Sequence, residues 1–291
     1  MKTSVIIATH ARPASLARLL ASLAPGLASE PREIIVAENG TPAPMQLASG
    51  PNPLKHLHEP RPGKCRIQNR AIAEATGDIL VFLDDDLTVA PNYLAAVESF
   101  FDTHREFAGM KGRILPQDDP DKKVGPMSVY LDLPIADHGD NVIEVRGVLG
   151  ANMAFRASAL RQVGPFDERL GPGACGHEEE TEMSARLKRA GFRIGYAPEA
   201  LVYHEVDRSR ADRERFIRIS RERGRCRMIH EKHSATEVIV RNAVALTRLR
   251  LAQLVGASLP RIAREERRLA IARGMFDGLG HHSRPPTSPI A

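Results

Sequence analysis

The stretch Ile79-Leu80-Val81-Phe82-Leu83-Asp84-Asp85-Asp86 joins five consecutive large apolar residues to three carboxylates. An apolar run bounded by Gly77-Asp78 and by aspartate predicts a strand buried on both faces, as in parallel sheets. Ligands of open α/β sheets bind beyond the carboxyl ends of the strands. Asp84 and Asp86, two apart in extended chain, are therefore predicted to point together toward one Mg²⁺ or Mn²⁺ ion and substrate phosphates. The alternative is a solvated turn before a helix that Pro91 starts.

Length and composition allow one large α/β domain, or a domain plus an appendage, of ordinary soluble character. The chain has 291 residues, of which 42% are hydrophobic, 26% are charged and 4% are aromatic, with no tryptophan. So few aromatic rings argue against a stacking platform, and no nucleic-acid partner is expected. The net charge is +5, yet Arg208 to Lys232 holds ten basic and four acidic residues and contributes +6. That run predicts a solvated helix face, or a surface for an anionic ligand or a membrane.

Cysteine usage and the N-terminus predict a cytoplasmic protein. Cys65, Cys175 and Cys226 are widely spaced, odd in number and lack a Cys-x-x-Cys pair, which argues against zinc and against a disulfide framework. A reducing cytosol fits such cysteines best. The first apolar run is too short for a signal peptide, and no stretch reaches the roughly 20 apolar residues of a membrane span. A peripheral place at the inner face of the membrane is the alternative.

Strands and helices alternate through the first hundred residues. Strands are predicted at 5–8, 34–37, 54–58 and 79–83, with helices from Pro13 and over 63–75 between them. This alternation predicts parallel strands with right-handed crossovers, a Rossmann-like sheet. Its strand ends carry Thr9, Glu38 and Asp84, which are expected to converge on one crevice.

The pattern is looser after that point. A helix is predicted over 91–101, and strands are predicted over 107–115, 142–148, 192–197 and 200–203. The stretch from Gly150 to Phe155 begins with small residues and continues with apolar ones. This pattern indicates either close approach of the backbone to a ligand or a strand entry with a turn. Long amphipathic helical patterns follow residue 208, and the tail from Gly280 is expected to be disordered.

Acidic residues open the helix predicted after residue 177. In His177-Glu178-Glu179-Glu180-Thr181-Glu182, at about 100° per residue, Glu179 and Glu180 flank the apolar stripe while Glu178 points away. The helix dipole favours carboxylates in a first turn, which would explain the cluster without any function. It does not explain acids on the apolar side. A glutamate there, opening on a cleft, is a candidate general base.

Several motifs, in order, resemble glycosyltransferase family two over residues 3–208. The family comprises inverting nucleotide-sugar transferases with the GT-A fold, a mixed α/β sheet flanked by helices. The resemblance rests on a set of motifs spread along the chain. They are Ser4 to Thr9, Asn69-Arg70-Ala71 before Gly77-Asp78, Phe82 to Asp86, Gly150 to Phe155, Val163-Gly164-Pro165-Phe166-Asp167-Glu168, Glu179 to Leu187, and Ala197 to His204.

The resemblance implies a role for each candidate residue. Glu180 occupies the family's catalytic-base position, usually Asp, and Glu179 beside it leaves open which of the two is the base. Asp86 and His204 would hold Mn²⁺ or Mg²⁺ on the diphosphate. Glu38 stands where the family more often has Asp, which puts its base-recognition contact in question. The residues implied in nucleotide-sugar binding are Thr9, Arg12, Glu38, Asp84, Asp85 and Arg208.

The implied activity is metal-dependent transfer of a sugar, with inversion, in cell-surface polysaccharide or glycolipid synthesis. The expected donor is a nucleoside-diphosphate sugar, a UDP-sugar first of all, and the expected acceptor is a glycan or a lipid-linked glycan. A GT-A catalytic domain is expected over 1–207, with a nucleotide-sugar half to about residue 106 and an acceptor half from 107. A helical extension would follow over 208–279, with peripheral membrane contact through 208–275.

Two other functions fit parts of the sequence. Asp84-Asp85-Asp86-Leu87-Thr88-Val89 matches the Asp-x-Asp-x-Thr-Val pattern of haloacid-dehalogenase-like phosphatases, where Asp84 would be the nucleophile and Asp86 the acid and base. That class needs a second acidic pair downstream, and no convincing one is present. A non-catalytic sugar-binding protein of the same fold is the other alternative, because fold does not determine function.

Overall fold

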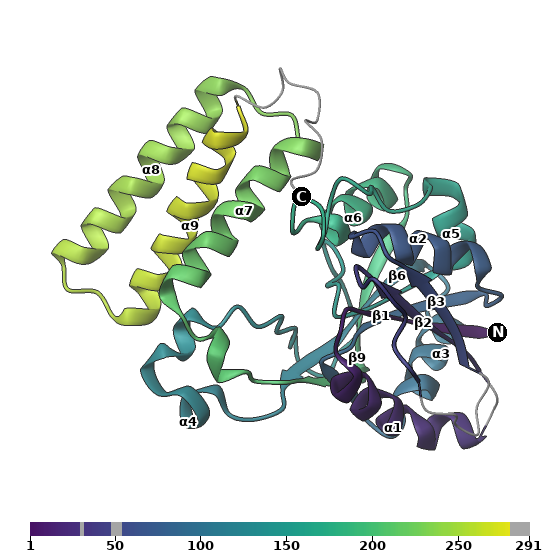
Figure 1. Ribbon diagram of the computed structural model, residues 1–291. Helices are drawn as coiled ribbons and strands as arrows, with labels where there is room; N and C mark the ends of the chain where they lie inside the picture. The colour runs from purple at the N-terminus through teal and green to yellow at the C-terminus, as the bar shows by residue number, and fades with distance from the viewer. Residues whose placement is uncertain (30–31, 48–53, 280–291) are drawn as a thin grey trace. The chain divides into compact units, whose positions relative to one another are not determined.

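A computed structural model of the chain describes residues 1–29, 32–47 and 54–279. It divides into two compact units. The first consists of Met1–Asp119, Leu133–Ala174 and Glu179–Val206, and it holds the sheet (Figure 1). The second consists of Pro120–Asp132, Cys175–Glu178 and Asp207–Ala291, and it holds the C-terminal helices.

Within the described residues, one mixed sheet of nine strands forms the centre of the first unit. The strand order is β3-β2-β1-β4-β8-β6-β9-β5, with β7 paired to β9. The first four strands in this order are parallel, whereas β8 runs antiparallel to both β4 and β6. The bounds are β1 (Thr3–Thr9), β2 (Glu33–Asn39), β3 (Leu54–Glu59), β4 (Ile79–Asp84), β5 (Leu87–Val89), β6 (Phe107–Pro116), β7 (Ile143–Glu144), β8 (Asn152–Arg156) and β9 (Arg193–His204).

Helices cover both faces of the sheet, as Figure 1 shows. α1 (Pro13–Ser29) and α3 (Tyr93–Thr103) pack on one face. α2 (Lys64–Glu74), α5 (Ala157–Val163) and α6 (Glu179–Arg189) pack on the other. Both faces of the central strands are thereby removed from water, which explains why those strands read as unbroken apolar runs.

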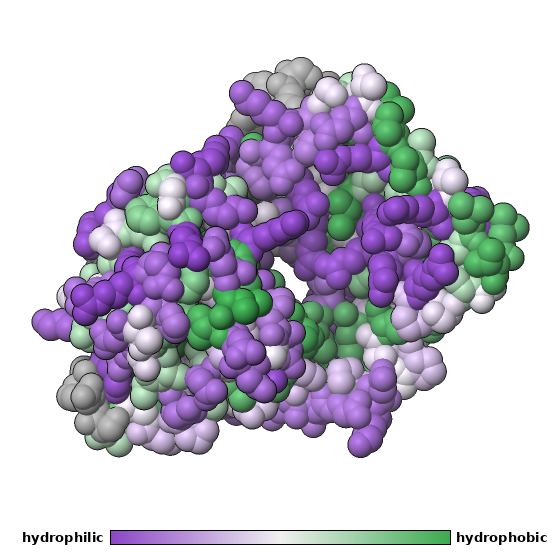
Figure 2. All heavy atoms as spheres, turned by 180° about the vertical axis from the view of Figure 1, so that it is seen from behind, coloured by the Kyte–Doolittle hydropathy of each residue, from purple (hydrophilic) through white to green (hydrophobic). Residues whose placement is uncertain are grey.

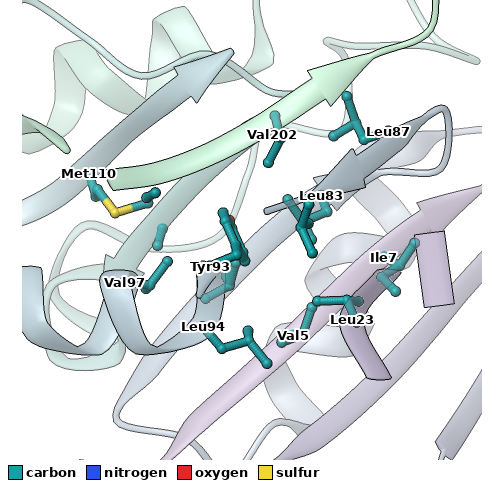
Figure 3. Close-up of a cluster of buried hydrophobic side chains, with 14 of the residues drawn as sticks. Val5, Ile7, Leu23, Leu83, Leu87, Tyr93, Leu94, Val97, Met110 and Val202 are labelled. Atoms are coloured by element: carbon teal, nitrogen blue, oxygen red, sulfur yellow. The ribbon is translucent and has the colours of Figure 1, made fainter. Parts of the chain in front are cut away.

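The predicted burial of β4 on both faces is confirmed. Its apolar residues are at most 2% exposed, with Val81 and Leu83 in the core under α1 and α3, and Phe82 in the core under α2, α5 and α6. Figure 3 shows the first of these cores, where side chains from β1, β4, β9, α1 and α3 meet. Each fully buried side chain of this size contributes ~1.5–3 kcal/mol to stability.

The second half of the sheet differs from the sequence prediction in detail. The strand predicted at 142–148 is reduced to the two residues of β7, and the two strands predicted at 192–197 and 200–203 are one, β9. The helix expected from Pro91 begins at Tyr93, and a short strand that was not predicted, β5, lies between the aspartates and this helix. Local apolar patterns do not encode partners or direction, so the pairing of β5 and β8 could not be derived from them.

The second unit is built on three long helices, α7 (Arg213–His230), α8 (Ala235–Leu254) and α9 (Leu259–Gly278). The short helices α4 (Pro120–Val124) and η1 (Gly125–Tyr130) and the turn η2 (Arg208–Arg210) belong to the same unit. Gly224 of α7 and Gly274 of α9 let the two helices approach closely, because a Cβ on either would overlap with the backbone of the other helix.

Acidic partners neutralise much of the basic segment predicted as a charged surface. Arg223 binds Asp132 through two hydrogen bonds of 2.8 and 2.6 Å, and Arg221 binds Asp277. Arg213 likewise donates to Glu266. These arginines stabilise the unit internally, so the formal +6 of the segment overstates the charge it offers to a ligand.

The expectation that the cysteines remain unpaired is wrong for two of the three. Cys175 and Cys226 form a disulfide with their Cα atoms 5.6 Å apart, whereas Cys65 is a buried free thiol. The pairing joins residues 51 apart in sequence, so spacing alone could not indicate it. Disulfides are rare in the reducing cytosol, and the pair therefore weighs against the cytoplasmic location inferred from the cysteine count.

The tail from Gly280 lies outside the described residues. Among the helices that the structure describes, none is both long and apolar enough to cross a membrane.

The disulfide predicts a thiol count. Protein denatured without reductant should show one reactive thiol per chain, Cys65, and three after reduction. Cys226→Ser should lower the free energy of unfolding by about 4 kcal/mol, the chain-entropy value for a loop of this length. Urea unfolding checks the loss, with oxidised and reduced wild-type protein for comparison. Three reactive thiols before reduction would show that the pair does not form.

Candidate active site

The three aspartates do not lie on one extended strand. Asp84 is the last residue of β4, and Asp85 and Asp86 form a turn that leads into β5. β5 then pairs antiparallel with β9, which places Leu87 opposite His204. Asp84 and Asp86, predicted to point the same way, have different partners in the structure: Asp84 pairs with Lys64, and Asp86 lies near His204 and Arg12.

Asp85 is the buried member of the three. It is 4% exposed, and its two carboxylate oxygens accept from the Thr9 hydroxyl at 2.6 Å and the Arg12 guanidinium at 3.2 Å. Burial raises the pKa of Asp85, against the lowering effects of Thr9 and Arg12. Thr9 and Arg12 were predicted to line a nucleotide pocket, and in the structure both hold this turn.

Asp86 faces His204. Asp86 Oδ1 lies 3.4 Å from His204 Nε2, and Asp86 Oδ2 accepts from Arg12 at 3.1 Å. His204 Nδ1 is 2.9 Å from the carbonyl oxygen of Glu205, which can only accept, so Nδ1 carries the proton. Nε2 is then the nitrogen that can offer a lone pair to a metal ion, and it faces Asp86. This carbonyl-oriented histidine beside a carboxylate is a typical arrangement of metal ligands, so both residues fit a divalent ion.

A lysine that sequence reasoning missed connects the strand end to the glutamates. Lys64, the first residue of α2, donates to Asp84 Oδ1 at 2.6 Å and lies 3.8 Å from Glu179 Oε1. Burial acts to lower the pKa of Lys64, but the charges of Asp84 and Glu179 outweigh it and the pKa is raised. A cation in the first turn of a helix opposes the helix dipole. That local mismatch was the signal that could have pointed to Lys64.

Glu179 and Glu180 begin α6 next to this lysine. A Cβ on Gly150 would lie 3.7 Å from Lys64 Nζ and 3.9 Å from both glutamates, so this residue lines the same cluster. Burial, and then the charge of Glu179, raises the pKa of Glu180 to about 8, and Lys64 opposes the shift. A carboxylate this basic can accept a proton from a hydroxyl group near neutral pH.

Glu38 lies at the end of β2 with its carboxylate already occupied. Its side chain is fully buried and accepts from the Thr41 hydroxyl, the Met45 backbone and His56, at 2.8 to 2.9 Å. These contacts fix the segment after β2.

Residues 4–164 match the family model described as Glycosyl transferase family 2, which is more than half of the chain. The chain belongs to glycosyltransferase family 2. This membership decides against the phosphatase alternative, and the ion pair of Asp84 with Lys64 gives that aspartate another role.

The chain is similar to two glycosyl-transferring enzymes over about seven-tenths of its length. The pre-mycofactocin glycosyltransferase of Mycobacterium tuberculosis is 29% identical over 213 residues, 69% of this chain and 42% of that protein. The chain thus matches less than half the length of this relative. The glucosyl-dolichyl phosphate glucuronosyltransferase of Haloferax volcanii is 21% identical over 219 residues, 71% of this chain and 70% of that protein.

A solved structure confirms the predicted fold. Mannosyltransferase PcManGT from Pyrobaculum calidifontis, in complex with GDP-Man and Mn²⁺, has a TM-score of 0.59 and 14% sequence identity. The match covers 96% of this chain and 87% of that chain. The GT-A type mixed sheet with flanking helices, expected from the sequence, is therefore the fold of this family 2 protein.

Arg208 is the one predicted site residue outside the first unit. It lies in η2 and is exposed. Its contact with a diphosphate stays a prediction.

Because Asp85 is buried, we expect the hydrogen bond that Thr9 donates to it to stabilise the folded protein. Thr9→Val would remove the 2.6 Å donor and raise the pKa of Asp85 further, so an ionised Asp85 becomes more costly. The free energy of unfolding should fall by about 1–3 kcal/mol near neutral pH. The loss should shrink as the pH falls through the folded-state pKa of Asp85, because the protonated carboxyl carries no charge to bury.

Urea unfolding at two pH values, one near neutral and one near the ordinary pKa of aspartate, measures the loss in the free energy of unfolding at each. Thr103→Val, at an exposed position of α3, is the control and should change little. An equal loss at both pH values would contradict the assignment to Asp85.

Proposed function

We propose that the chain is a metal-dependent glycosyltransferase that moves a sugar from a nucleoside-diphosphate sugar to an acceptor hydroxyl, with inversion. The observation that supports it most is the pair formed by Asp86, in the turn after β4, and His204, at the end of β9, with the histidine oriented by the Glu205 carbonyl. The Lys64 cluster with Asp84, Glu179 and Glu180 supplies a base of raised pKa in the same unit.

Asp86 and His204 would hold a Mn²⁺ or Mg²⁺ ion against the diphosphate. When bound, the ion neutralises negative charge that develops on the leaving nucleoside diphosphate. Arg12 keeps Asp86 in place through its 3.1 Å contact. The mixed nitrogen and oxygen donors favour Mn²⁺ over Mg²⁺, which prefers oxygen ligands.

Glu180 would act as the general base. It takes the proton of the acceptor hydroxyl while the hydroxyl oxygen forms a bond to the anomeric carbon, and the bond from that carbon to the diphosphate breaks. Attack from the face opposite the leaving group inverts the anomeric centre. Glu179 lies 3.8 Å from Lys64 and contributes to the raised pKa of Glu180, which supports Glu180 rather than Glu179 as the proposed base.

The donor would be a nucleoside-diphosphate sugar, with a UDP-sugar as the first candidate. The similar mannosyltransferase structure is a complex with GDP-Man, so both nucleotide classes belong in any screen. Lys64 bound to Asp84 would lie on the sugar and nucleoside side of the site. Glu38 would act through the segment from Thr41 to Met45, which its carboxylate holds.

The activity is tested by nucleoside-diphosphate release from a panel of UDP- and GDP-sugars with glycan and lipid-linked acceptors. Release should require Mn²⁺ or Mg²⁺. Asp86→Ala should abolish it, and Glu180→Gln should lower the rate by about 10²–10⁴. Glu199→Gln, an exposed acid of β9, is the matched control and should leave the rate unchanged. Binding of a nucleotide sugar without turnover would favour the sugar-binding alternative.

The raised pKa of Glu180 predicts the pH profile. Because the base must be ionised, kcat/KM should rise with pH and level off above about 8. Glu179→Gln removes the neighbouring negative charge, so the rising limb should move to lower pH while activity persists. If Glu179→Gln abolished activity and Glu180→Gln only shifted the limb, the roles of the two would be reversed.

The acceptor would be presented at a membrane surface. α8 and the residue after it expose a stripe of Val240, Val244, Leu251, Leu254 and Val255, each at least 49% exposed. At about 100° per residue these positions fall within one face about 100° wide, as in helices that lie in the membrane interface. Figure 2 shows hydrophobic residues gathered along this helix, at the right of the view.

Arginines border the stripe on both sides. Arg248 lies along one edge and Arg250 along the other, and both are exposed. Arginines in these positions can reach anionic headgroups while the apolar face enters the bilayer. This arrangement narrows the membrane contact predicted for residues 208–275 to α8 and supports a lipid-linked acceptor.

Vesicle binding tests this surface. The protein should co-sediment with vesicles containing phosphatidylglycerol at low salt and less so at high salt. Leu251→Glu with Leu254→Glu should remove the binding. Ile143→Glu replaces an exposed apolar residue of β7 and should have no effect. A wild-type protein that stays in the supernatant at low salt would rule the surface out.

A further inference from the structure

The second unit brings three possible metal ligands together apart from the residues of the proposed transfer. Glu178, His230 and Glu231 each offer one ligand atom, and the three atoms lie within 4.8 Å of one another. Glu178 immediately precedes α6, His230 ends α7, and Glu231 follows it.

Two of these atoms are buried and form no hydrogen bond. The side chains of Glu178 and His230 are 4% and 6% exposed, and within the part of the chain that the structure describes, Glu178 Oε2 and His230 Nε2 have no hydrogen-bond partner. Buried polar atoms are nearly always hydrogen-bonded, so a facing pair without such a bond requires an explanation. The two atoms face each other at 3.5 Å.

That separation suits one ion bound by both atoms. Zinc bonds to histidine nitrogen and carboxylate oxygen are about 2.0–2.2 Å long, and the edge of such a tetrahedron is roughly 3.4 Å. The proposed ligands of the catalytic ion, Asp86 Oδ1 and His204 Nε2, have nearly the same separation, 3.4 Å. The Glu231 side chain is 40% exposed, which gives its carboxylate room to complete the set.

The surroundings hold the ligands in place. Arg227 donates to the other oxygen of Glu178, Oε1, at 3.2 Å and leaves Oε2 directed at His230. His233 lies 2.8 Å from Glu231 Oε2. The C-terminal end of α7, with its unsatisfied carbonyl groups, favours a cation. Glu178 has a backbone φ of 77°, a left-handed conformation that is unusual for glutamate and typical of functional positions. The positive charge of Arg227 opposes an ion, and the two carboxylates together outweigh it.

We propose that Glu178, His230 and Glu231 bind a structural zinc ion. A ligand set of one imidazole and two carboxylates suits zinc better than Mg²⁺ or Ca²⁺, which prefer oxygen alone. The ion links the C-terminal end of α7 to the residue directly before Glu179 and Glu180. It thereby anchors the same short segment, Cys175–Glu178, that the disulfide joins to α7.

The test is a zinc titration of chelator-treated protein. It is done without reductant, so that Cys175 and Cys226 stay paired and offer no thiolates. An Asp86→Ala, His204→Ala background removes the catalytic metal ligands. This background should bind one zinc ion per chain, measured by competition with a zinc-sensitive dye. At about a hundredfold excess over Kd, zinc should raise the unfolding midpoint by roughly 5 °C.

Adding Glu178→Gln or His230→Ala to that background should weaken zinc binding at least tenfold and abolish the thermal shift, with the fold checked by circular dichroism. His104→Ala is the matched control, because His104 Nδ1 also lies 3.5 Å from a glutamate, Glu106, but on the exposed surface. The His104→Ala variant should still bind zinc. No zinc in the background protein, or full binding in the folded Glu178→Gln variant, would overturn the proposal. Neither result bears on the proposed transfer reaction, which is tested separately by nucleoside-diphosphate release.

Discussion

The buried carboxylate of Asp85 is the constraint on which the strand-end site depends. A charge held at 4% exposure is costly unless it is hydrogen-bonded, and Thr9 and Arg12 supply the donors from the neighbouring end of β1. With Asp85 turned inward, Asp84 is directed to Lys64 and Asp86 to His204. One tight turn therefore gives three adjacent, chemically identical residues three different environments.

Lys64 extends this electrostatic arrangement to the glutamates. Its ammonium group lies between Asp84 and Glu179, and Glu179 in turn contributes to the raised pKa of Glu180. Carboxyl groups whose environments push their proton affinities apart are the usual basis of acid and base roles in enzymes. Lys64 thus couples the donor side of the proposed reaction to its base.

Much of this architecture was encoded locally, and the rest was not. The apolar run of β4 and its acidic end followed from burial and spacing, as did the position of Glu179 and Glu180 at the start of a helix. Asp86 and His204 come together only through the pairing of β5 with β9, which no local pattern specifies, and only the family resemblance joined them. Lys64 and the Cys175–Cys226 disulfide were missed for the same reason, because their partners are distant in sequence.

The central claim is that the turn separates the three aspartates into a structural residue, a metal ligand and a partner of Lys64. Anomalous scattering from crystals grown with Mn²⁺ and a nucleoside diphosphate tests it most directly. The account predicts a manganese peak bound by Asp86 and His204 Nε2, with Asp85 still bound to Thr9 and Arg12. A peak bridging Asp84 and Asp86, with His204 turned away, would contradict it.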